Sequence, residues 1–195
     1  MHDNFTYTQE IYRKLIHLSS CSYALALWYF GKDVVLPWFI GIAIILPALD
    51  YSRNHITLLS RIFVYFFATF TRTIEYRILT GASWVAIGAA LTTFIFNENI
   101  AIIGLLVLST ADSAAAIVGI KYGKTQLFNK SLEGSIAFFI TASIIVYFLS
   151  PTLFIINLCA VLSATTTELF STPRFNDNLF IPIITSFTLS LGSIL

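Results

Sequence analysis

The chain has 195 residues, of which 57% are hydrophobic and only 11% are charged. An average soluble domain is about 25% charged, so this composition excludes a disordered chain and nearly every soluble fold. The low fraction of charged residues also excludes a nucleic-acid binder of the basic-patch kind, whereas the net charge of +1 is uninformative and only the positions of the charges can be interpreted. We therefore predict an all-α integral membrane protein, with one polytopic domain over residues 1–195.

Seven apolar segments are long enough to be membrane spans, since a spanning helix needs about 20 apolar residues, or about 17 when short. They are 15–31, 34–50, 80–96, 99–119, 132–149, 152–169 and 178–195. An eighth apolar run, 58–70, is shorter and contains Arg61. We expect it to form an interfacial helix; the alternative is that it dips into the membrane or spans it.

The positions of the basic residues predict the orientation of the spans. Cytoplasmic connections carry an excess of Lys and Arg. With the N-terminus in the cytoplasm, the seven spans leave Lys32 alone on the opposite side. The cytoplasmic basic residues are then Arg13, Lys14, Arg53, Arg61, Arg72, Arg77, Lys121, Lys124, Lys130 and Arg174. We predict an N-in, C-out protein whose longer connections, 51–79 and 120–131, face the cytoplasm.

Asp112 is the least expected charge in the sequence, because it lies inside the apolar run 100–120. An ionised carboxylate in a membrane costs several kcal/mol unless it is paired, hydrated or bound to a metal. Small residues follow it at 113–116, and these permit the close approach of another helix. We favour a functional carboxylate over the alternative, a structural carboxylate paired with a nearby basic residue.

The segment 119–135, which follows Asp112, combines lysines with glycines and hydroxyl groups. Glycines let backbone N–H groups approach phosphates, and lysines supply positive charge. Ser131 is expected to cap the next helix, whose N-terminus also favours anions. No Walker A motif is present. A simple cytoplasmic loop would explain the lysines, but it gives less reason for the glycines.

Further polar residues are predicted at the same side of the membrane. Arg13, Lys14 and His17 share a helical face because His17 follows them by four and three positions. Glu168 and Asp177 flank the short connection 169–176. Each group also has a simpler interpretation, as a positive flank or as a helix cap. Carboxylates beside a basic, glycine-rich loop nevertheless indicate a site for Mg²⁺ and a nucleotide.

Several motifs occur in an order that resembles a known family. They are Arg13-Lys14-x-x-His17, Leu79-Thr80-Gly81-Ala82-Ser83, Ala111-Asp112-Ser113-Ala114-Ala115-Ala116-x-x-Gly119, Tyr122-Gly123-Lys124, Lys130-Ser131-x-Glu133-Gly134-Ser135 and Asp177-Asn178 before Pro182. The chain is similar from about residue 13 to 185 to the polyprenol and diacylglycerol kinases. This family includes dolichol kinases, phytol kinases and CTP-dependent diacylglycerol kinases. It usually has Gly where this chain has Ala111.

The resemblance implies a CTP-dependent kinase that phosphorylates a membrane lipid alcohol with Mg²⁺. Its partners would be CTP, the lipid alcohol and membrane lipids, without nucleic acid. The implied catalytic residues are Asp112 and three candidates for the general base, His17, Glu133 and Glu168. The implied nucleotide-binding residues are Gly119, Lys121, Gly123, Lys124, Lys130, Ser131, Gly134, Arg13, Lys14 and Asn178. The implied metal ligands are Asp112 and Asp177.

Two other functions stay open at the level of the sequence. One is a cytidylyltransferase that makes a CDP-lipid, because the family is distantly similar to phosphatidate cytidylyltransferases. Their longer C-terminal signature is not visible in this chain. The other is a small transporter, although no half-repeat with broken helices is apparent. Arg72 and Glu75, at helical spacing within 51–79, are expected to form a structural ion pair.

Overall fold

The computed structural model describes residues 7–67, 79–128, 130–172 and 175–193. These residues are almost entirely helical, which confirms the predicted all-α class. The helices are α1 (Tyr7–Leu18), α2 (Cys21–Phe30), α3 (Lys32–Arg53), α4 (Thr57–Phe67), α5 (Gly81–Ile95), α6 (Glu98–Leu106), α7 (Asp112–Tyr122), α8 (Leu132–Leu149), α9 (Phe154–Leu169) and α10 (Asp177–Ser190). A π-helical segment, Val107–Ala111, joins α6 to α7, and a 3-10 turn, Leu191–Ser193, follows α10.

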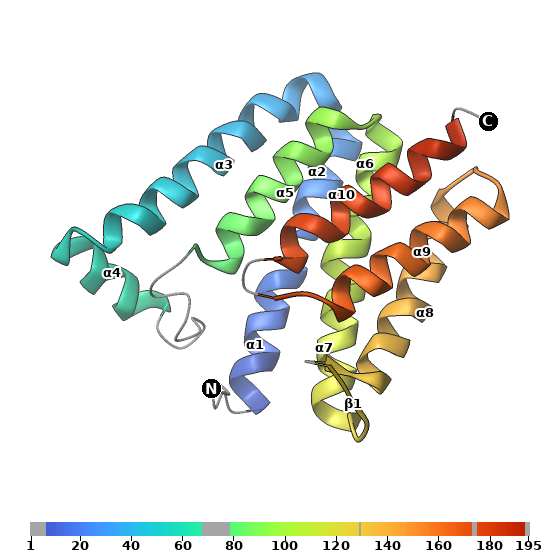
Figure 1. Cartoon of the computed structure of the whole chain (residues 1–195). Helices are drawn as coiled ribbons and strands as arrows, with labels where there is room; N and C mark the ends of the chain where they lie inside the picture. Colours follow the sequence, from blue (N-terminus) through green and yellow to red (C-terminus); the bar gives the residue numbers. More distant parts are fainter. Residues whose placement is uncertain (1–6, 68–78, 129, 173–174, 194–195) are drawn as a thin grey trace.

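Several of the described connections between helices lie at one of two ends of the bundle (Figure 1). One end, called the hairpin end here, carries the beginning of α1 and an antiparallel hairpin of β1 (Gln126–Leu127) and β2 (Lys130–Ser131). The end of α9 and the beginning of α10 lie toward the same side. The opposite end, called the far end, carries the turns from α2 to α3, from α5 to α6 and from α8 to α9.

Two apolar clusters form the core. The larger cluster lies among α5 to α10 and includes the fully buried side chains of Phe138, Leu108 and Ile181. The smaller cluster joins α2 and α3 to α5 and α6 around Leu27 and Phe39. Because α5 and α6 contribute to both clusters, they connect the α2–α3 part of the molecule to the α7–α10 part.

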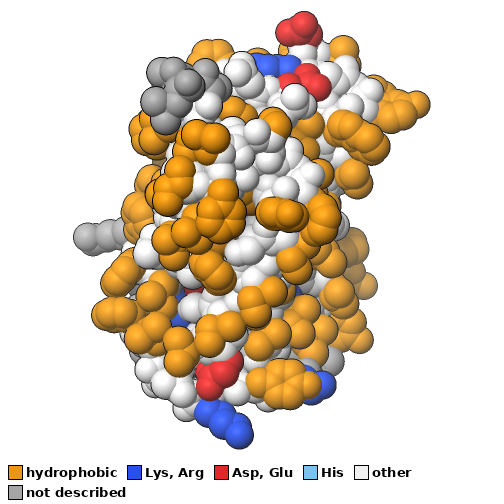
Figure 2. All heavy atoms as spheres, turned by 90° about the vertical axis from the view of Figure 1, so that its right-hand side faces the viewer, with side chains coloured by type: hydrophobic (Ala, Val, Ile, Leu, Met, Phe, Trp, Pro, Cys, Tyr) orange, Lys and Arg blue, Asp and Glu red, His pale blue; other side chains and the backbone are white. Residues whose placement is uncertain are grey.

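The surface is that of a membrane protein. Among the described residues, three helical stretches are long and apolar enough to cross a membrane: Lys32–Arg53, Glu98–Tyr122 and Leu132–Leu149. Hydrophobic side chains cover the middle of the face in Figure 2, and charged side chains lie above and below them. Such a broad exposed apolar surface is rare on a soluble monomer. The number of spans and their orientation stay predictions.

The first predicted span, 15–31, is not one continuous helix. The structure ends α1 at Leu18 and begins α2 at Cys21. The hydroxyl of Ser19 donates to the carbonyl of Ile16 (2.6 Å), a side-chain bond that competes with regular helix geometry. The predicted span 132–149 coincides with α8, and 99–119 corresponds to α6, the π-helical segment and α7 together. The other four predicted spans correspond to α3, α5, α9 and α10, with shifted boundaries.

The predicted interfacial segment, 58–70, begins as the helix α4, which follows α3 after a short turn. Residues 68–70 lie outside the described residues, as does the predicted ion pair between Arg72 and Glu75. Large apolar side chains of α4 are exposed, including Leu58, Tyr65 and Phe66. The described part of this segment is therefore helical, and whether it lies in the interface stays a prediction.

Candidate functional site

Asp112 is buried in the bundle, with 2% of its surface exposed. It is the first residue of α7, directly after the π-helical segment. Single π turns inside α-helices occur frequently at functional sites. Hydroxyl groups bond to backbone carbonyls around this turn: Ser109 to Leu105 (2.8 Å) and Ser113 to Ser109 (2.6 Å). These bonds place the Asp112 carboxylate at a local irregularity of a helix that is otherwise apolar.

The helix α1 supplies two partners for this carboxylate. Lys14 Nζ lies 2.5 Å from Asp112 Oδ2, and His17 Nε2 lies 3.2 Å from the same oxygen. His17 Nε2 also lies 3.4 Å from the carbonyl oxygen of Leu108 in the π turn. The third residue of the motif does not join this contact, because Arg13 Nε donates to Glu10 in its own helix (3.0 Å). The shared face predicted for the motif therefore holds for Lys14 and His17.

A second group of charges lies where β2 meets the ends of α9 and α10. Lys130 Nζ is 3.0 Å from Glu168 Oε1 and 3.2 Å from Asp177 Oδ2. The hydroxyl of Ser135, in the first turn of α8, donates to Glu168 Oε2 (3.2 Å). Burial alone would lower the pKa of Lys130, but the carboxylates of Asp177, Glu168 and Asp112 outweigh it and raise this pKa above its usual value. Lys130 is therefore charged at neutral pH.

The two groups form one polar cluster. Asp177 is close enough to both Asp112 and Lys14 for electrostatic interaction, and Lys130 interacts in the same way with Asp112. The cluster consists of Lys14, His17, Asp112, Lys130, Glu168 and Asp177. Three carboxylates against two ammonium groups leave one negative charge when His17 is neutral. This balance suits a site that takes up a cation together with an anionic ligand.

The carboxylates of Asp112 and Asp177 are the groups that could hold a metal ion. Within the described ranges, no three His, Cys, Asp or Glu side chains gather as a ready-made ligand group. Mg²⁺ usually keeps several waters and binds one or two carboxylates together with substrate phosphates. The residues therefore fit a Mg²⁺ ion that arrives with a nucleotide, rather than a metal enclosed by the protein alone.

The glycines predicted to approach phosphates lie where α7 and α8 are in close contact. A Cβ atom at Gly134 would lie 2.8 Å from the carbonyl oxygen of Ala115, and one at Gly119 would lie 2.8 Å from Ser131 Oγ. At Gly123 it would lie 2.2 Å from the carbonyl oxygen of Gly119. Ser131 caps α8, as predicted, by accepting a hydrogen bond from the Gly134 N–H (3.1 Å). These glycines thus fix the hairpin against α7.

Three other predicted residues lie at the surface of the hairpin end. Lys121 and Lys124 are exposed, and the Lys121 ammonium lies 5.1 Å from the centre of the Tyr122 ring. Glu133 is half-buried and accepts hydrogen bonds from the Thr125 N–H at 3.2 and 3.3 Å. The structure therefore separates Glu133 from the polar cluster, whereas His17 and Glu168, the other candidates for the general base, belong to it.

Sequence reasoning did not assign a role to the buried carboxylate of Asp50, near the end of α3. Its Oδ2 accepts hydrogen bonds from the Thr80 N–H (2.7 Å), the Thr80 hydroxyl (2.8 Å) and the Ser83 hydroxyl (2.6 Å). Its Oδ1 lies 3.4 Å from an Arg53 nitrogen. The Leu79–Ser83 motif is thus the start of α5 bound to α3. A carboxylate followed at a distance by a Thr-x-x-Ser cap was the available signal.

The start of α5 also contacts the start of α10. The Asn178 side-chain amide donates to the carbonyl oxygen of Gly81 (3.4 Å), and Asn178 is itself buried. A Cβ atom at Gly88 would lie 2.6 Å from the carbonyl oxygen of Asn178. Asn178 therefore connects α10 to α5, next to Asp177 in the polar cluster.

Comparison with known proteins shows which sequences are similar to this chain. The chain is 33% identical over 180 residues to an uncharacterized protein of Rickettsia prowazekii, with 88% of each chain covered. It is 32% identical over 187 residues to an uncharacterized protein of Methanocaldococcus jannaschii, with 93% of each covered. It is also 33% identical over 142 residues to CTP-dependent diacylglycerol kinase 1 of Saccharomyces cerevisiae, covering 70% of this chain and 49% of the yeast protein.

Similar matches to kinases of the same name in two further fungi agree with this result. This chain belongs to the diacylglycerol kinase family. It spans about half the length of the Saccharomyces cerevisiae kinase that it matches. No family model and no solved structure matches the chain. The membership agrees with the resemblance seen in the sequence motifs.

Proposed function

We propose that this protein is a CTP-dependent lipid-alcohol kinase, which transfers the γ-phosphoryl group of CTP to the hydroxyl of a membrane diacylglycerol or prenol. The observation that carries the proposal is the buried Asp112 carboxylate, paired with Lys14 at 2.5 Å beside a hairpin that bears Lys130. The names of the fungal relatives support CTP as the donor and diacylglycerol as one acceptor.

Phosphoryl transfer relies mainly on positioning and charge neutralisation, and the polar cluster offers both. The lipid hydroxyl oxygen attacks the γ-phosphorus, the bond to the β–γ bridging oxygen breaks, and CDP leaves. Lys14 and Lys130 neutralise phosphate oxygens, with the N-terminus of α8 as a further anion-binding group. The hydroxyl proton goes to a base in the cluster, for which His17 and Glu168 are the candidates.

Mg²⁺ is the cofactor that we propose for this reaction. Asp112 and Asp177 would hold it, and it would neutralise charge on the transferred phosphate. Both carboxylates come from the beginnings of helices, α7 and α10, at one side of the cluster. Their electrostatic repulsion is offset by Lys14 and Lys130 in the described structure.

The fate of the labelled phosphate tests this function. Purified protein in detergent, given γ-labelled CTP, Mg²⁺ and a diacylglycerol or prenol, should form CDP and a labelled lipid monophosphate. A cytidylyltransferase would instead release the label as pyrophosphate and leave cytidine on the lipid. Recovery of a CDP-lipid from phosphatidate, or no transfer of label to any lipid alcohol, would contradict the proposal.

We also propose that the protein crosses the membrane several times and that the hairpin end faces the cytoplasm. The basic bias of the sequence supports this orientation. Lys32, the basic residue predicted on the other side, lies at the far end, where its Nζ donates to the Phe96 carbonyl (2.9 Å). Cysteines placed at Lys32 and Glu98 should react with an impermeant reagent only from outside. Cysteines at Thr125 and Asn176 should react only from the cytoplasm, and labelling of Lys32 and Thr125 from one side would contradict the topology.

A further inference from the structure

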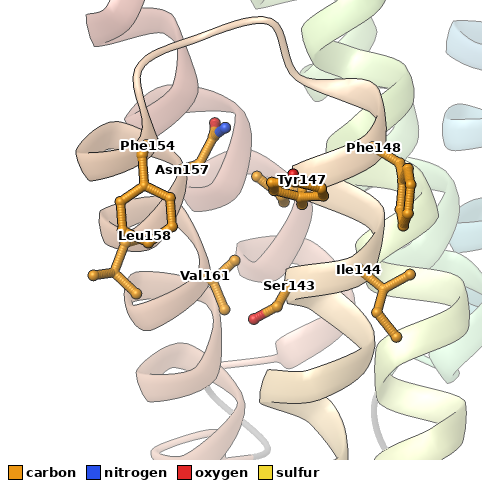
Figure 3. A pocket seen from close by; sticks show the side chains of 9 residues that line it. Ser143, Ile144, Tyr147, Phe148, Phe154, Asn157, Leu158 and Val161 are labelled. Atoms are coloured by element: carbon orange, nitrogen blue, oxygen red, sulfur yellow. The ribbon is translucent and has the colours of Figure 1, made fainter.

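An apolar groove opens between α8 and α9 near the far end of the bundle (Figure 3). It has a volume of about 330 Å³, near the lower end of the range of roughly 300–1,000 Å³ that small-molecule sites occupy. Tyr147 and Ile144 line it from α8, and Leu158 and Phe154 line it from α9. The side chains of Tyr147, Ile144 and Phe154 are exposed, so the groove is open on the apolar surface of the molecule.

The same two helices reach the polar cluster at their other ends. Ser135, in the first turn of α8, donates to Glu168 Oε2 in the last turn of α9. Ser143 lies eight residues beyond Ser135 along α8, and Tyr147 lies twelve beyond it. At about 1.5 Å per residue, these positions are about 12 and 18 Å from Ser135. One leaflet of the hydrocarbon core is about 15 Å thick, half of about 30 Å. The groove is therefore within reach of a hydrocarbon chain whose head lies at the cluster.

An exposed apolar row runs along α8 toward the groove. Ile136, Ile140 and Ile144 follow one another at four-residue spacing on α8 and are 49%, 53% and 54% exposed. Residues at this spacing share one face of a helix. The row begins beside Ser135 and ends at Ile144, which itself lines the groove. The exposed surface of α8 is thus apolar from the groove back to the turn of the helix that carries Ser135.

We propose that the groove binds the distal part of a hydrocarbon chain of the lipid-alcohol substrate, while its hydroxyl lies at the polar cluster. The inference rests on the proposed kinase function, because that function requires the hydroxyl end of the substrate to lie at the polar cluster. Substrates with long hydrocarbon chains gain affinity from this contact, and analogues with short chains do not. The occupant is the substrate itself, and ordinary bilayer phospholipid is the alternative that the experiment must exclude.

The kinetic test fills the groove and compares substrates of two chain lengths. Ser143→Phe places an aromatic ring in the groove, and the Ser143 hydroxyl has no hydrogen-bond partner among the described residues to lose. Cys159→Phe is the matched control, since Cys159 is an exposed residue of α9 that does not line the groove. For dioleoylglycerol, Ser143→Phe should raise KM roughly tenfold, an effect typical of small changes in apolar pockets. For dioctanoylglycerol, it should leave KM unchanged, and Cys159→Phe should change neither KM.

A binding test that needs no turnover separates this proposal from the kinase function. A diacylglycerol with a photoreactive group at the end of one acyl chain should label peptides that contain Ser143–Phe148 or Phe154–Val161. Ser143→Phe should suppress this labelling, and Cys159→Phe should preserve it. Equal labelling by phosphatidylcholine with the same photoreactive chain would overturn the proposal, as would labelling and KM values that Ser143→Phe leaves unchanged. Specific labelling without phosphoryl transfer would refute only the kinase function.

Discussion

Replacing Asp112 by Asn should abolish phosphoryl transfer and also destabilise the protein. The change keeps the size of the side chain but removes the charge that faces Lys14 at 2.5 Å and His17 at 3.2 Å. Both Lys14 and Asp112 are buried, so the ammonium group is left without its counter-ion. Removing one partner of a buried ion pair costs about 3–5 kcal/mol.

The stability loss can be converted to a measurable shift in Tm. For a protein of this size, 1 kcal/mol corresponds to about 2–4 °C, so Asp112→Asn should lower Tm by about 6–20 °C in detergent. The double variant Lys14→Met/Asp112→Leu removes both charges and should recover most of this loss, because an apolar pair can replace a buried ion pair. Both variants should lose more than about 100-fold of the rate of γ-phosphate transfer to lipid. Even residues that only hydrogen-bond to metal ligands typically change metal affinity or activity by about 10–100-fold when they are replaced.

The two measurements together test the role of Asp112. If the folded Asp112→Asn protein kept most of the wild-type transfer rate, the carboxylate would not be part of the catalytic site. If the double variant recovered both stability and activity, Asp112 would be only the structural partner of Lys14. A double variant as unstable as Asp112→Asn would show that the ion pair does not explain the stability loss.

Three further outcomes follow from the packing and charges of the structure. Gly134→Ala should destabilise the protein by about 1–3 kcal/mol, because the new Cβ atom would lie 2.8 Å from the Ala115 carbonyl oxygen. The control Gly41→Ala, whose Cβ atom would have nothing within 4 Å, should be neutral or stabilising. Equal Tm values for the two variants would contradict this contrast. Asp50→Ala leaves the hydrogen-bond donors of Thr80 and Ser83 unsatisfied, at a cost of about 1–3 kcal/mol each. It should therefore lower Tm, while the folded protein keeps its phosphoryl-transfer rate. A loss of activity without a loss of stability would instead place Asp50 in the active site. Because the pKa of Lys130 is raised, its ion pairs stabilise the fold fully below the usual lysine pKa of about 10.4, and this stabilisation is lost only at higher pH. The Tm difference between wild type and Lys130→Gln should therefore be constant from about pH 6 to 9. A Tm difference that declined over this interval would contradict the raised pKa.

Much of the fold follows from the sequence because long apolar runs determine where helices lie. The break after Leu18 does not, since the run 15–31 contains no Pro and has Gly only at its end, and the Ser19 side-chain bond that marks the turn cannot be predicted from its composition. Asp112 could be predicted as a candidate site residue because a carboxylate inside an apolar run is costly. Its partner was not, because the spacing of Arg13, Lys14 and His17 does not reveal which residue faces a helix that lies about a hundred positions later. Spacing alone also cannot distinguish Glu168, which is buried and paired with Lys130, from Glu133, which is half-buried and bonds to the Thr125 N–H.

The contact between α1 and α7 also has a consequence for biosynthesis. Lys14 and Asp112 are 98 positions apart in the chain. At about 5–20 residues per second, Lys14 leaves the ribosome about 5–20 seconds before its partner is made. During that interval its ammonium group has no buried carboxylate to balance it, and an unpaired charge is costly in a bilayer. We therefore expect the part of α1 that carries Lys14 to stay in the hydrated interface until α7 is inserted. Completion of the polar cluster is thus among the last events of assembly, so an incompletely inserted chain lacks the assembled site.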